Sequence, residues 1–562
     1  MRLQNGEKRR KISALALRSF GSIDSNLTLP DLIGGVTHDT LDAILNGKRW
    51  TLNTSLDLIE NFENLNRGHY FPKTVIRNGD PDIRASWEPA RLQHIILLLA
   101  VSNLNHTRAK QSQIFEYIRN EILCWIRNNP FLEGPHYASA MECGLRIIVF
   151  IYALKRLIGL SIYEKGEIAA AVYKHAWWIS KRLSLYSSLG NHTICECIGL
   201  IFTGGLFRYR IKGQEWLERG IKLLNQELNH QILDDGGPAE QSIAYHRIVL
   251  DLFWLAYNYI DLNSFSDLRH WEGRLVSGER FISFFNESSG SLISIGDSDD
   301  GYAIAPGITP RKSTGTESAL GAYLFEDAGY SVFSSEQITF TFDHGPLGMA
   351  PLYNHGHADA LSITLSYRNK AILVDSGTYR YNGVPQWRRY FKSTRAHNTV
   401  TMDNQDQAIQ ASGVVWQKPY SCRLLKSERQ KTYMRAVAEH DGYRRFNEPV
   451  THRRTVELSI SEILIEDSFR GKGSHIFELN YHLHPDAIIE PNGDGWIICI
   501  GEVRCFIKLM NGYDLTPANG RTDPIHGWYS PAYNIKQPTA TLTCSKRGLP
   551  EKVIFGTHIK LL

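Results

Sequence analysis

The feature that most constrains this chain is a change in its hydrophobic period near residue 329. Between about residues 90 and 285 the apolar residues recur every three or four positions, which is typical of amphipathic helices. After residue 329 apolar and polar residues alternate, which is typical of strands. A chain of 562 residues is also too long for one hydrophobic core. The sequence therefore predicts a multidomain α + β protein, with a helical part before a β part.

The helical part contains successive stretches with helical spacing, including the apolar run 95–101 and a stretch that stops at Pro130. The connections between them are short or carry turn residues, as expected for antiparallel helix pairs. Helix pairs of this kind can close into a ring, so we expect an incomplete α/α toroid. Periodicity alone does not establish the closure.

The second part consists of short alternating runs separated by turn signals such as Asn492-Gly493. Many strands in sequence without helices between them favour stacked antiparallel sheets, here an antiparallel β-sandwich. We place the boundary between the parts within 310–328. The expected division is 1–85 (a poorly assigned N-terminal segment), 86–320 (the toroid domain) and 321–562 (the sandwich domain).

Composition narrows the class of partner only slightly. Lys and Arg number 62 against 58 Asp and Glu, so the formal charge of +4 favours neither an acidic nor a neutral polymer. Because no long basic block occurs, nucleic-acid binding gets little support. The eight cysteines have neither zinc-cluster nor disulfide-framework spacing. No run approaches about 18 apolar residues, so no membrane span is expected.

The strongest local signal is the pair His355 and His357, which precedes a predicted strand and is followed by Asp375 and His397. Side chains of these types suit Zn²⁺. Residues two apart on a strand project to one side, so both histidines are expected to face one cleft. If both bind one ion, the site is closed and structural. If only His357 binds, His355 is free for proton transfer. An isolated pair of this kind is more often simply a polar start to a strand.

Three other motifs carry polar groups. Asn191 and His192 begin a predicted helix, where Asn also serves as a good N-cap. Tyr245 and His246 are adjacent on another predicted helix, so they point about 100° apart and only one can face a given cleft. A helical tyrosine is usually a core residue. The acidic loop 296–301 lacks EF-hand spacing, so we expect a turn with Asx capping there.

Several segments, in order along the chain, resemble the heparinase II/III family of polysaccharide lyases. The best match spans 343–407 and contains DHGPLG, NHGHADALSITL, LVDSGTYRYN and WRRYFKSTRAHNTVTMDNQDQ. Smaller matches are GNHTICECIGLIFTGGLF, DGGPAEQSIAYHRIVLDLF, IGDSDDGYA and FEDAGYSVF. The resemblance covers roughly residues 190–407. It implies a helical toroid followed by a β-sandwich.

The resemblance also implies residue roles. The family's metal triad, commonly holding a structural Zn²⁺, is matched by His357, Asp375 and His397. His355 matches the family's catalytic histidine, and Tyr245 matches its catalytic tyrosine. Asn191, with or without His192, matches the group that binds the substrate carboxylate. Alginate-cleaving relatives use a second tyrosine, for which Tyr381 and Tyr390 are candidates that spacing does not separate.

The chemistry of β-elimination explains why such groups are needed. The C5 hydrogen of a uronic acid is weakly acidic, and its removal builds negative charge that a donor such as Asn191 stabilises. A base takes this proton and an acid protonates the departing O4. Tyr245 is expected to serve as one or both, and His355 either assists it or is the base itself. The expected substrate-binding residues are Gln241, Arg388, Arg389 and Arg395, since an arginine fork suits carboxylates and sulfates.

We therefore expect a polysaccharide lyase that cleaves an acidic, uronic-acid-containing polysaccharide. One alternative is an α/α-toroid glycoside hydrolase, which needs two carboxylates and offers Glu240 and Asp235 without a convincing pair. Another is a non-catalytic glycan-binding or assembly protein of a polysaccharide system. The resemblance implies a periplasmic or secreted bacterial protein. The basic N-terminus lacks a persuasive signal-peptide core, so a cytoplasmic location stays open. The sequence does not identify the polymer, endo or exo action, or the oligomeric state.

Overall fold

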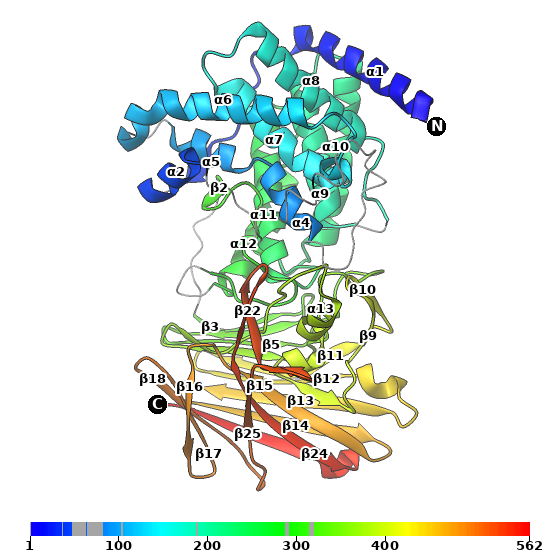
Figure 1. The fold of residues 1–562 in the computed structure, drawn as a ribbon. Helices are drawn as coiled ribbons and strands as arrows, with labels where there is room; N and C mark the ends of the chain where they lie inside the picture. The colour runs from blue at the N-terminus through cyan, green and yellow to red at the C-terminus, as the bar shows by residue number, and fades with distance from the viewer. Residues whose placement is uncertain are drawn as a thin grey trace. The chain divides into compact units, whose positions relative to one another are not determined.

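The computed structural model describes residues 2–35, 37–47, 63, 82–102, 105–186, 189–286, 291–313 and 320–562 (Figure 1). Contacts divide the chain into two compact units. The helical unit comprises Met1–Gln231, Arg247–Leu275 and Tyr302–Ser313, and the β unit comprises Ile232–His246, Val276–Gly301 and Thr314–Leu562. The predicted order, helices before strands, is confirmed (Figure 1).

The helical unit is built from long helices, as the hydrophobic period predicts. The helices are α1 (Arg2–Ser19), α2 (His38–Leu45), α4 (Ile83–Ala90), α5 (His94–Val101), α6 (Gln111–Asn128), α7 (Ala140–Arg156), α8 (Ile162–Ile179), α9 (Asn191–Leu206), α10 (Ile211–Gln231), α11 (Ile243–Leu262) and α12 (Arg269–Ser283), the last two of which are divided between the units. A short ladder pairs β1 (Leu32–Gly34) with β2 (Ile308–Pro310).

Helices α7 to α10 pack against their neighbours in chain order. Helices α7 and α9 approach closely because each carries a glycine at the contact: a Cβ on Gly199 would lie 2.8 Å from the Cα of Gly144. Helix α8 begins with a capping box, in which Ser161 and Glu164 satisfy each other's backbone N–H. Sequential packing is what the expected toroid requires, and closure of the ring stays a prediction.

Several helix bounds follow from the sequence. The apolar run 95–101 lies within α5, and α6 ends at Asn128, just before Pro130. Helices α1 and α2 were not anticipated within the poorly assigned segment 1–85, and most of residues 48–81 lie outside the described part of the chain. Within the described residues, no helix combines the length and apolar character that crossing a membrane requires.

The β unit contains three large antiparallel sheets. An eight-stranded sheet runs in the order β11 (Cys422–Gln430), β12 (Tyr433–His440), β13 (Val450–Ser459), β14 (Glu462–Gly471), β25 (Ile554–Leu561), β18 (Val503–Leu509), β17 (Gly495–Ile500) and β16 (Ile488–Asn492). A five-stranded sheet runs β3 (Gly321–Phe325), β4 (Tyr330–Ser334), β5 (Ile338–Asp343), β6 (Ile363–Tyr367) and β7 (Lys370–Leu373). A four-stranded sheet runs β19 (Thr516–Asn519), β24 (Ala540–Gly548), β15 (His475–His482) and β8 (Val400–Met402).

Smaller pieces complete the β unit. They are the helix α13 (Pro385–Lys392) and the two-stranded ladders β9 (Ile409–Ser412) with β10 (Val415–Gln417), β20 (Arg521–Thr522) with β21 (Ile525–His526), and β22 (Trp528–Ala532) with β23 (Ile535–Pro538). Of the predicted boundary region 310–328, residues 314–319 lie outside the described residues, and β3 begins at Gly321. The expected class of antiparallel sheets in the C-terminal half is therefore confirmed.

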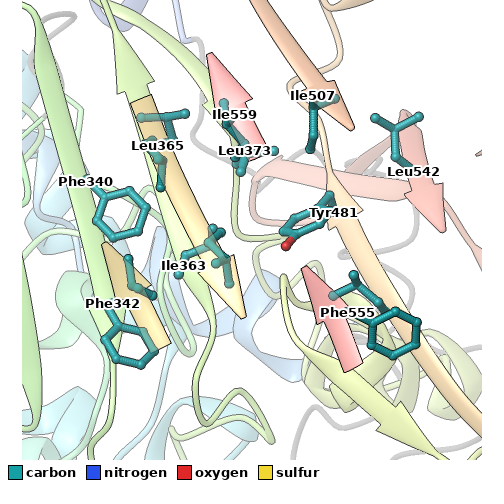
Figure 2. Packing of buried hydrophobic residues seen from close by; sticks show 14 of the residues in the cluster. Phe340, Phe342, Ile363, Leu365, Leu373, Tyr481, Ile507, Leu542, Phe555 and Ile559 are labelled. Carbon is teal, nitrogen blue, oxygen red and sulfur yellow. The ribbon is translucent and has the colours of Figure 1, made fainter. Parts of the chain in front are cut away.

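One hydrophobic core joins the three sheets, because alternate strand residues point to the same face. Figure 2 shows Phe340 and Leu365 of the five-stranded sheet in the same cluster as Tyr481 of the four-stranded sheet and Ile559 of the eight-stranded sheet. The Tyr481 hydroxyl donates a hydrogen bond to Thr557 Oγ1 at 2.9 Å, so its polar end is satisfied within the core.

Replacing Leu365 with Ala should lower the free energy of unfolding of the β unit by about 2–5 kcal/mol, because the fully buried side chain leaves a cavity between packed sheets. Denaturant unfolding followed by circular dichroism measures the change. Ile488→Ala is the matched control, since this strand residue is 65% exposed and its truncation should change the free energy by no more than about 0.5 kcal/mol. Equal losses for the two variants would contradict the position of the core.

Candidate active site and metal centre

The rings of Tyr245 and His355 stack, with centroids 3.9 Å apart and planes inclined by 27°. Tyr245 lies in the first turn of α11, and His355 lies in the connection between β5 and β6. The neighbouring His246 is buried and meets Phe281 edge-on, with centroids 5.5 Å apart. Of the two adjacent side chains, Tyr245 is the one that stacks on His355, in keeping with the roughly 100° between neighbours on a helix.

Tyr381 brings a second phenol to this pair. Its hydroxyl lies 3.1 Å from the hydroxyl of Tyr245, and either oxygen can donate. Tyr390, the other candidate, is buried on α13, and its hydroxyl accepts a hydrogen bond from the backbone N–H of Trp528 at 3.3 Å. The geometry therefore favours Tyr381 as the second tyrosine.

His357, Asp375 and His397 form a buried group whose potential ligand atoms all lie within 4.8 Å of one another. They come from the β5–β6 connection, the segment after β7 and the segment before β8. His397 Nδ1 lies 2.8 Å from Asp375 Oδ2. His357 Nδ1 and His397 Nε2 are buried and have no hydrogen-bond partner among the described residues. Since buried polar atoms are nearly always paired, and these groups suit a divalent cation, the group can hold a metal ion.

The two histidines do not project from a strand, so this part of the prediction is wrong. Residues 354–359 form turns and irregular backbone, and β6 begins only at Ile363. A Cβ on Gly356, between the histidines, would lie 1.5 Å from the carbonyl oxygen of Leu347, so the loop is held too tightly against its neighbour for any larger residue. In the described part of the chain the possible ligand group includes His357 and not His355. This arrangement matches the alternative in which only His357 of the two histidines binds a metal ion.

Asp297 is the residue that joins the two histidines. Its Oδ2 lies 3.1 Å from His355 Nδ1, and its Oδ1 lies 3.0 Å from His357 Nε2. Thr378 Oγ1 donates to Oδ1 at 2.7 Å, and the Arg388 guanidinium donates to both oxygens. The carboxylate is completely buried. One side chain therefore orients four groups from three separate segments.

This role of Asp297 was not predicted from the sequence. The acidic loop 296–301 was predicted to be a turn, and Asp299 indeed accepts a hydrogen bond from Gly301 N at 2.8 Å, as in an Asx turn. The partners of Asp297 lie 58 to 91 positions away, where no local pattern can indicate them. The available signal was an acid placed directly after the apolar Ile295-Gly296, where burial was to be expected.

The charges at the site follow from these contacts. Burial raises the pKa of Asp297, but the Arg388 guanidinium and the hydrogen bonds from His355, His357 and Arg388 outweigh it and hold the pKa well below its usual value. Burial lowers the pKa of His357 to about 4. Near pH 7 Asp297 is therefore anionic and His357 is neutral, which is the form of histidine that binds metal ions.

The Arg388 side chain donates hydrogen bonds to groups in the interior of the β unit. It is 1% exposed, and its Nε donates to the carbonyl oxygen of Gly413 at 2.8 Å. Its Nη1 donates to Asp297 and Thr378, and its Nη2 donates to Asp297 at 2.8 Å. The guanidinium carbon lies 4.7 Å from the centre of the Tyr381 ring. These contacts argue against the expectation that Arg388 binds substrate, because its N–H groups face acceptors of the protein.

The other expected substrate-binding residues differ in their exposure and in the contacts they make within the protein. Arg389 is exposed, whereas Arg395 pairs with both oxygens of Glu478 at 2.7 and 2.8 Å. Both arginines line a shallow pocket of about 570 Å³. Gln241 is buried, and its amide donates to the carbonyl oxygens of Pro238 and Ala328, so it joins two loops. Contact of these residues with substrate stays a prediction.

Asn191 and His192 belong to the helical unit, where they begin α9 as predicted. The N-cap position is Gly190, with φ of 110°, and it makes no side-chain capping bond. Asn191 is therefore the first helical residue and not the N-cap, so the capping role considered for its side chain does not apply. It is buried, and His192 is half-buried. Their role toward a substrate carboxylate stays a prediction.

The contacts of Asp235 argue against its role as a catalytic acid in the glycoside hydrolase alternative. The Asp235 carboxylate accepts backbone hydrogen bonds from Gly237, Asp327 and Ala328 at 2.8–3.0 Å. These bonds fix a turn of the β unit and occupy the oxygens that a hydrolytic acid needs. Glu240, the other candidate, is buried. The structure therefore does not support the pair of carboxylates that hydrolysis requires.

Comparison with known proteins gives two family matches. The heparinase II/III-like C-terminal family matches residues 319–555, and the heparinase II/III N-terminus family matches residues 125–268. The matches fall in the β part and the helical part of the chain, in that family's order.

Among curated relatives, a heparin-sulfate lyase of Bacteroides stercoris is 25% identical over 393 residues, which are 65% of this chain and 56% of the relative. A heparin-sulfate lyase of Bacteroides thetaiotaomicron is 22% identical over 342 residues, 53% of this chain and 47% of the relative. The chain thus spans about half the length of these curated relatives.

Solved structures share the fold. The crystal structure of heparinase III has a TM-score of 0.67 at 16% identity, over 100% of this chain and 90% of that one. The heparan sulfate lyase of Pedobacter heparinus has a TM-score of 0.59 at 15% identity, over 98% and 88%. With both family matches in order and this fold shared over nearly the whole chain, the protein belongs to the heparinase II/III family.

Proposed function

We propose that this protein is a polysaccharide lyase that cleaves a uronic-acid-containing polysaccharide by β-elimination. The observation that carries the proposal is the meeting of Tyr245, His355 and Tyr381, in which two hydroxyls lie 3.1 Å apart beside an imidazole. Such a group suits a reaction that removes one proton and delivers another. The relatives named heparin-sulfate lyases support the same class of reaction.

In the proposed reaction the C5–H bond of a uronic acid breaks, its proton passes to the base, and its electron pair is first delocalised onto the C5 carboxylate. The pair then forms the double bond between C4 and C5 as the bond from C4 to the bridging oxygen breaks, and the oxygen leaves with the electrons of that bond and takes a proton from the acid. Negative charge builds up on the C5 carboxylate before the bond breaks. Asn191, with or without His192, is the candidate donor to that carboxylate, because donors placed where charge develops lower the barrier.

Tyr245 is the proposed proton-transfer group. A phenol with its ordinary pKa of about 10 is protonated near pH 7, so it acts readily as an acid and needs help to act as a base. The Tyr381 hydroxyl can donate a hydrogen bond to a Tyr245 phenolate, and the guanidinium carbon of Arg388 lies 4.7 Å from the Tyr381 ring centre. His355 either assists Tyr245 or accepts the C5 proton itself.

Zn²⁺ is the proposed ion for the group His357, Asp375 and His397. Two imidazoles and one carboxylate form a donor set that zinc accepts, and two ring nitrogens of this group are buried without another partner among the described residues. When bound, zinc supplies a positive charge, and because its ligands come from three loops it also holds these loops together. Asp297 then takes the part of the outer carboxylate that commonly orients a metal-bound histidine.

The first test incubates the purified chain with heparan sulfate, alginate and hyaluronan and follows the ultraviolet absorbance of unsaturated uronates. At least one polymer should yield this chromophore. Tyr245→Phe should lower kcat on that polymer by on the order of 10²–10⁴, because proton transfer loses its group. Tyr209→Phe is the control, since this side chain is 64% exposed in the helical unit.

Three outcomes of that test count against the proposal. Shorter chains without the chromophore would indicate hydrolysis. Binding of a polymer without turnover would indicate a glycan-binding or assembly protein. Full activity of Tyr245→Phe would remove Tyr245 from the reaction.

The choice between the two candidate second tyrosines gives a separate prediction. Tyr381→Phe should lower kcat on the order of tenfold to a hundredfold, since it removes a hydrogen bond to a group that becomes charged. Tyr390→Phe should leave kcat within about twofold and lower only stability, by about 1 kcal/mol, because its hydroxyl accepts a bond from Trp528 N. Kinetics and thermal unfolding of both variants check this, and a reversed order of kcat would contradict it.

Zinc binding is tested on the protein without any substrate. The wild-type chain should bind one zinc ion per molecule in the described triad, and His397→Ala should lose most of that zinc and part of the thermal stability. His475→Ala is the matched control, because His475 is also buried beside an aspartate, with Nδ1 2.6 Å from Asp403 Oδ2, outside the triad. Metal content by mass spectrometry and the unfolding midpoint are the measurements. Equal zinc content in both variants would contradict the assignment.

A further inference from the structure

The carboxylate of Asp297 receives its donors in a symmetric way. Its Oδ2 faces His355 Nδ1 at 3.1 Å and Arg388 Nη2 at 2.8 Å. Its Oδ1 faces His357 Nε2 at 3.0 Å and Arg388 Nη1 at 2.5 Å, and also accepts from Thr378 Oγ1 at 2.7 Å. Each oxygen thus meets one imidazole and one end of the guanidinium.

These contacts fix which imidazole nitrogens carry hydrogen. An arginine side chain only donates, and a carboxylate paired with it at both oxygens only accepts. The nitrogen that each histidine turns toward Asp297 must therefore be an N–H: Nδ1 in His355 and Nε2 in His357. In a neutral imidazole the other nitrogen then holds a lone pair. That nitrogen is Nε2 in His355 and Nδ1 in His357, so the two rings carry opposite tautomers.

We infer that Asp297 is a positioning residue that sets opposite tautomers in His355 and His357, and so prepares one ring for proton transfer and the other for metal binding. The lone pair left on His355 Nε2 suits a proton acceptor beside Tyr245. The lone pair left on His357 Nδ1 is on a buried nitrogen with no hydrogen-bond partner among the described residues, as a metal ligand requires. The part concerning His355 rests on the proposed lyase function, whereas the tautomers and the metal ligand do not.

The main chain around Asp297 supports the same role. Asp297 N donates to the carbonyl oxygen of His355 at 2.9 Å. Ser242 Oγ donates to the carbonyl oxygen of Asp297 at 3.0 Å, just before the first turn of α11 that carries Tyr245. Asp297 therefore positions both members of the stacked pair, Tyr245 through the backbone and His355 through backbone and side chain.

An asparagine cannot reproduce this arrangement, although it has nearly the same shape. Its side chain offers one acceptor oxygen and one NH₂ group. Wherever the NH₂ lies, it faces one guanidinium N–H and one imidazole nitrogen. That imidazole must then accept instead of donate, so one of the two histidines changes its tautomer. Asp297→Asn should therefore disturb either metal binding or proton transfer, depending on which way the amide points. It should disturb both if the amide exchanges between the two orientations.

The direct test needs no variant. Two-bond ¹H–¹⁵N spectra of the full chain labelled with ¹⁵N-histidine report which ring nitrogen carries hydrogen, first without metal and then with zinc ion added. We expect His355 to show Nδ1–H with a lone pair on Nε2, and His357 to show Nε2–H with the zinc-induced shift on Nδ1. The opposite tautomer in His355, or a zinc-induced shift on His357 Nε2, would overturn the inference.

A pair of variants tests the consequence. Asp297→Asn should weaken zinc affinity or lower kcat by on the order of 10–100-fold, with KM for the cleaved polymer changed by less than about threefold. Asp403→Asn is the matched control, since Asp403 also faces a histidine Nδ1, that of His475, and should leave zinc affinity and kcat unchanged. Unchanged tautomers, zinc affinity and kcat in Asp297→Asn would overturn the inference.

If no polymer of the panel is cleaved, the lyase proposal fails, while the spectra and the zinc titration still decide the inference. If Asp297→Asn does not fold, the wild-type spectra decide it.

Discussion

The candidate site depends on a buried ion pair between Asp297 and Arg388. A carboxylate without exposure is stable only when donors replace the water it has lost, and here two imidazoles, a guanidinium and a hydroxyl do so. Removing one partner of such a pair costs about 3–5 kcal/mol because the other charge is left buried and unpaired. The pair is therefore a constraint on the fold as well as on the chemistry. It holds the loop of Asp297, the loop of the two histidines and α13 in one arrangement.

The sheets of the β unit provide the rigid support for these loops. Asn398, next to His397, donates to the carbonyl oxygens of Ile363 and Val374 at 2.7 and 2.9 Å, and so ties the start of β6 to the end of β7. Arg454, buried in the eight-stranded sheet and paired with Asp467, donates to the carbonyl oxygen of Leu361 at 2.7 Å. The candidate metal triad and His355 thus lie on loops whose ends are fixed by buried polar contacts. Loops on a rigid scaffold are where binding and catalytic groups most often occur.

The division into helices and sheets was predictable because hydrophobic periodicity is a local property. The triad could be proposed from residue types, and Tyr245 could be proposed from the family resemblance, but its stacking on His355 became visible only in the structure. Asp297 was missed because acids in loops are common and its partners come from distant segments. The pairing of Arg388 was missed for a related reason: its partner Asp297 lies in a distant segment, and its charge is neutralised in the interior. Long-range pairing of charges has no periodic signature, so sequence alone could not reveal it.

The central claim is that Asp297 acts on the reaction through His355. A double-mutant cycle at saturating zinc tests it, with kcat measured for wild type, Asp297→Asn, His355→Ala and the double variant. If Asp297 works through His355, the double variant should be no more than about threefold slower than His355→Ala, because groups that act as a unit give non-additive losses. Losses that multiply in the double variant would show that the two residues act independently and would contradict the account.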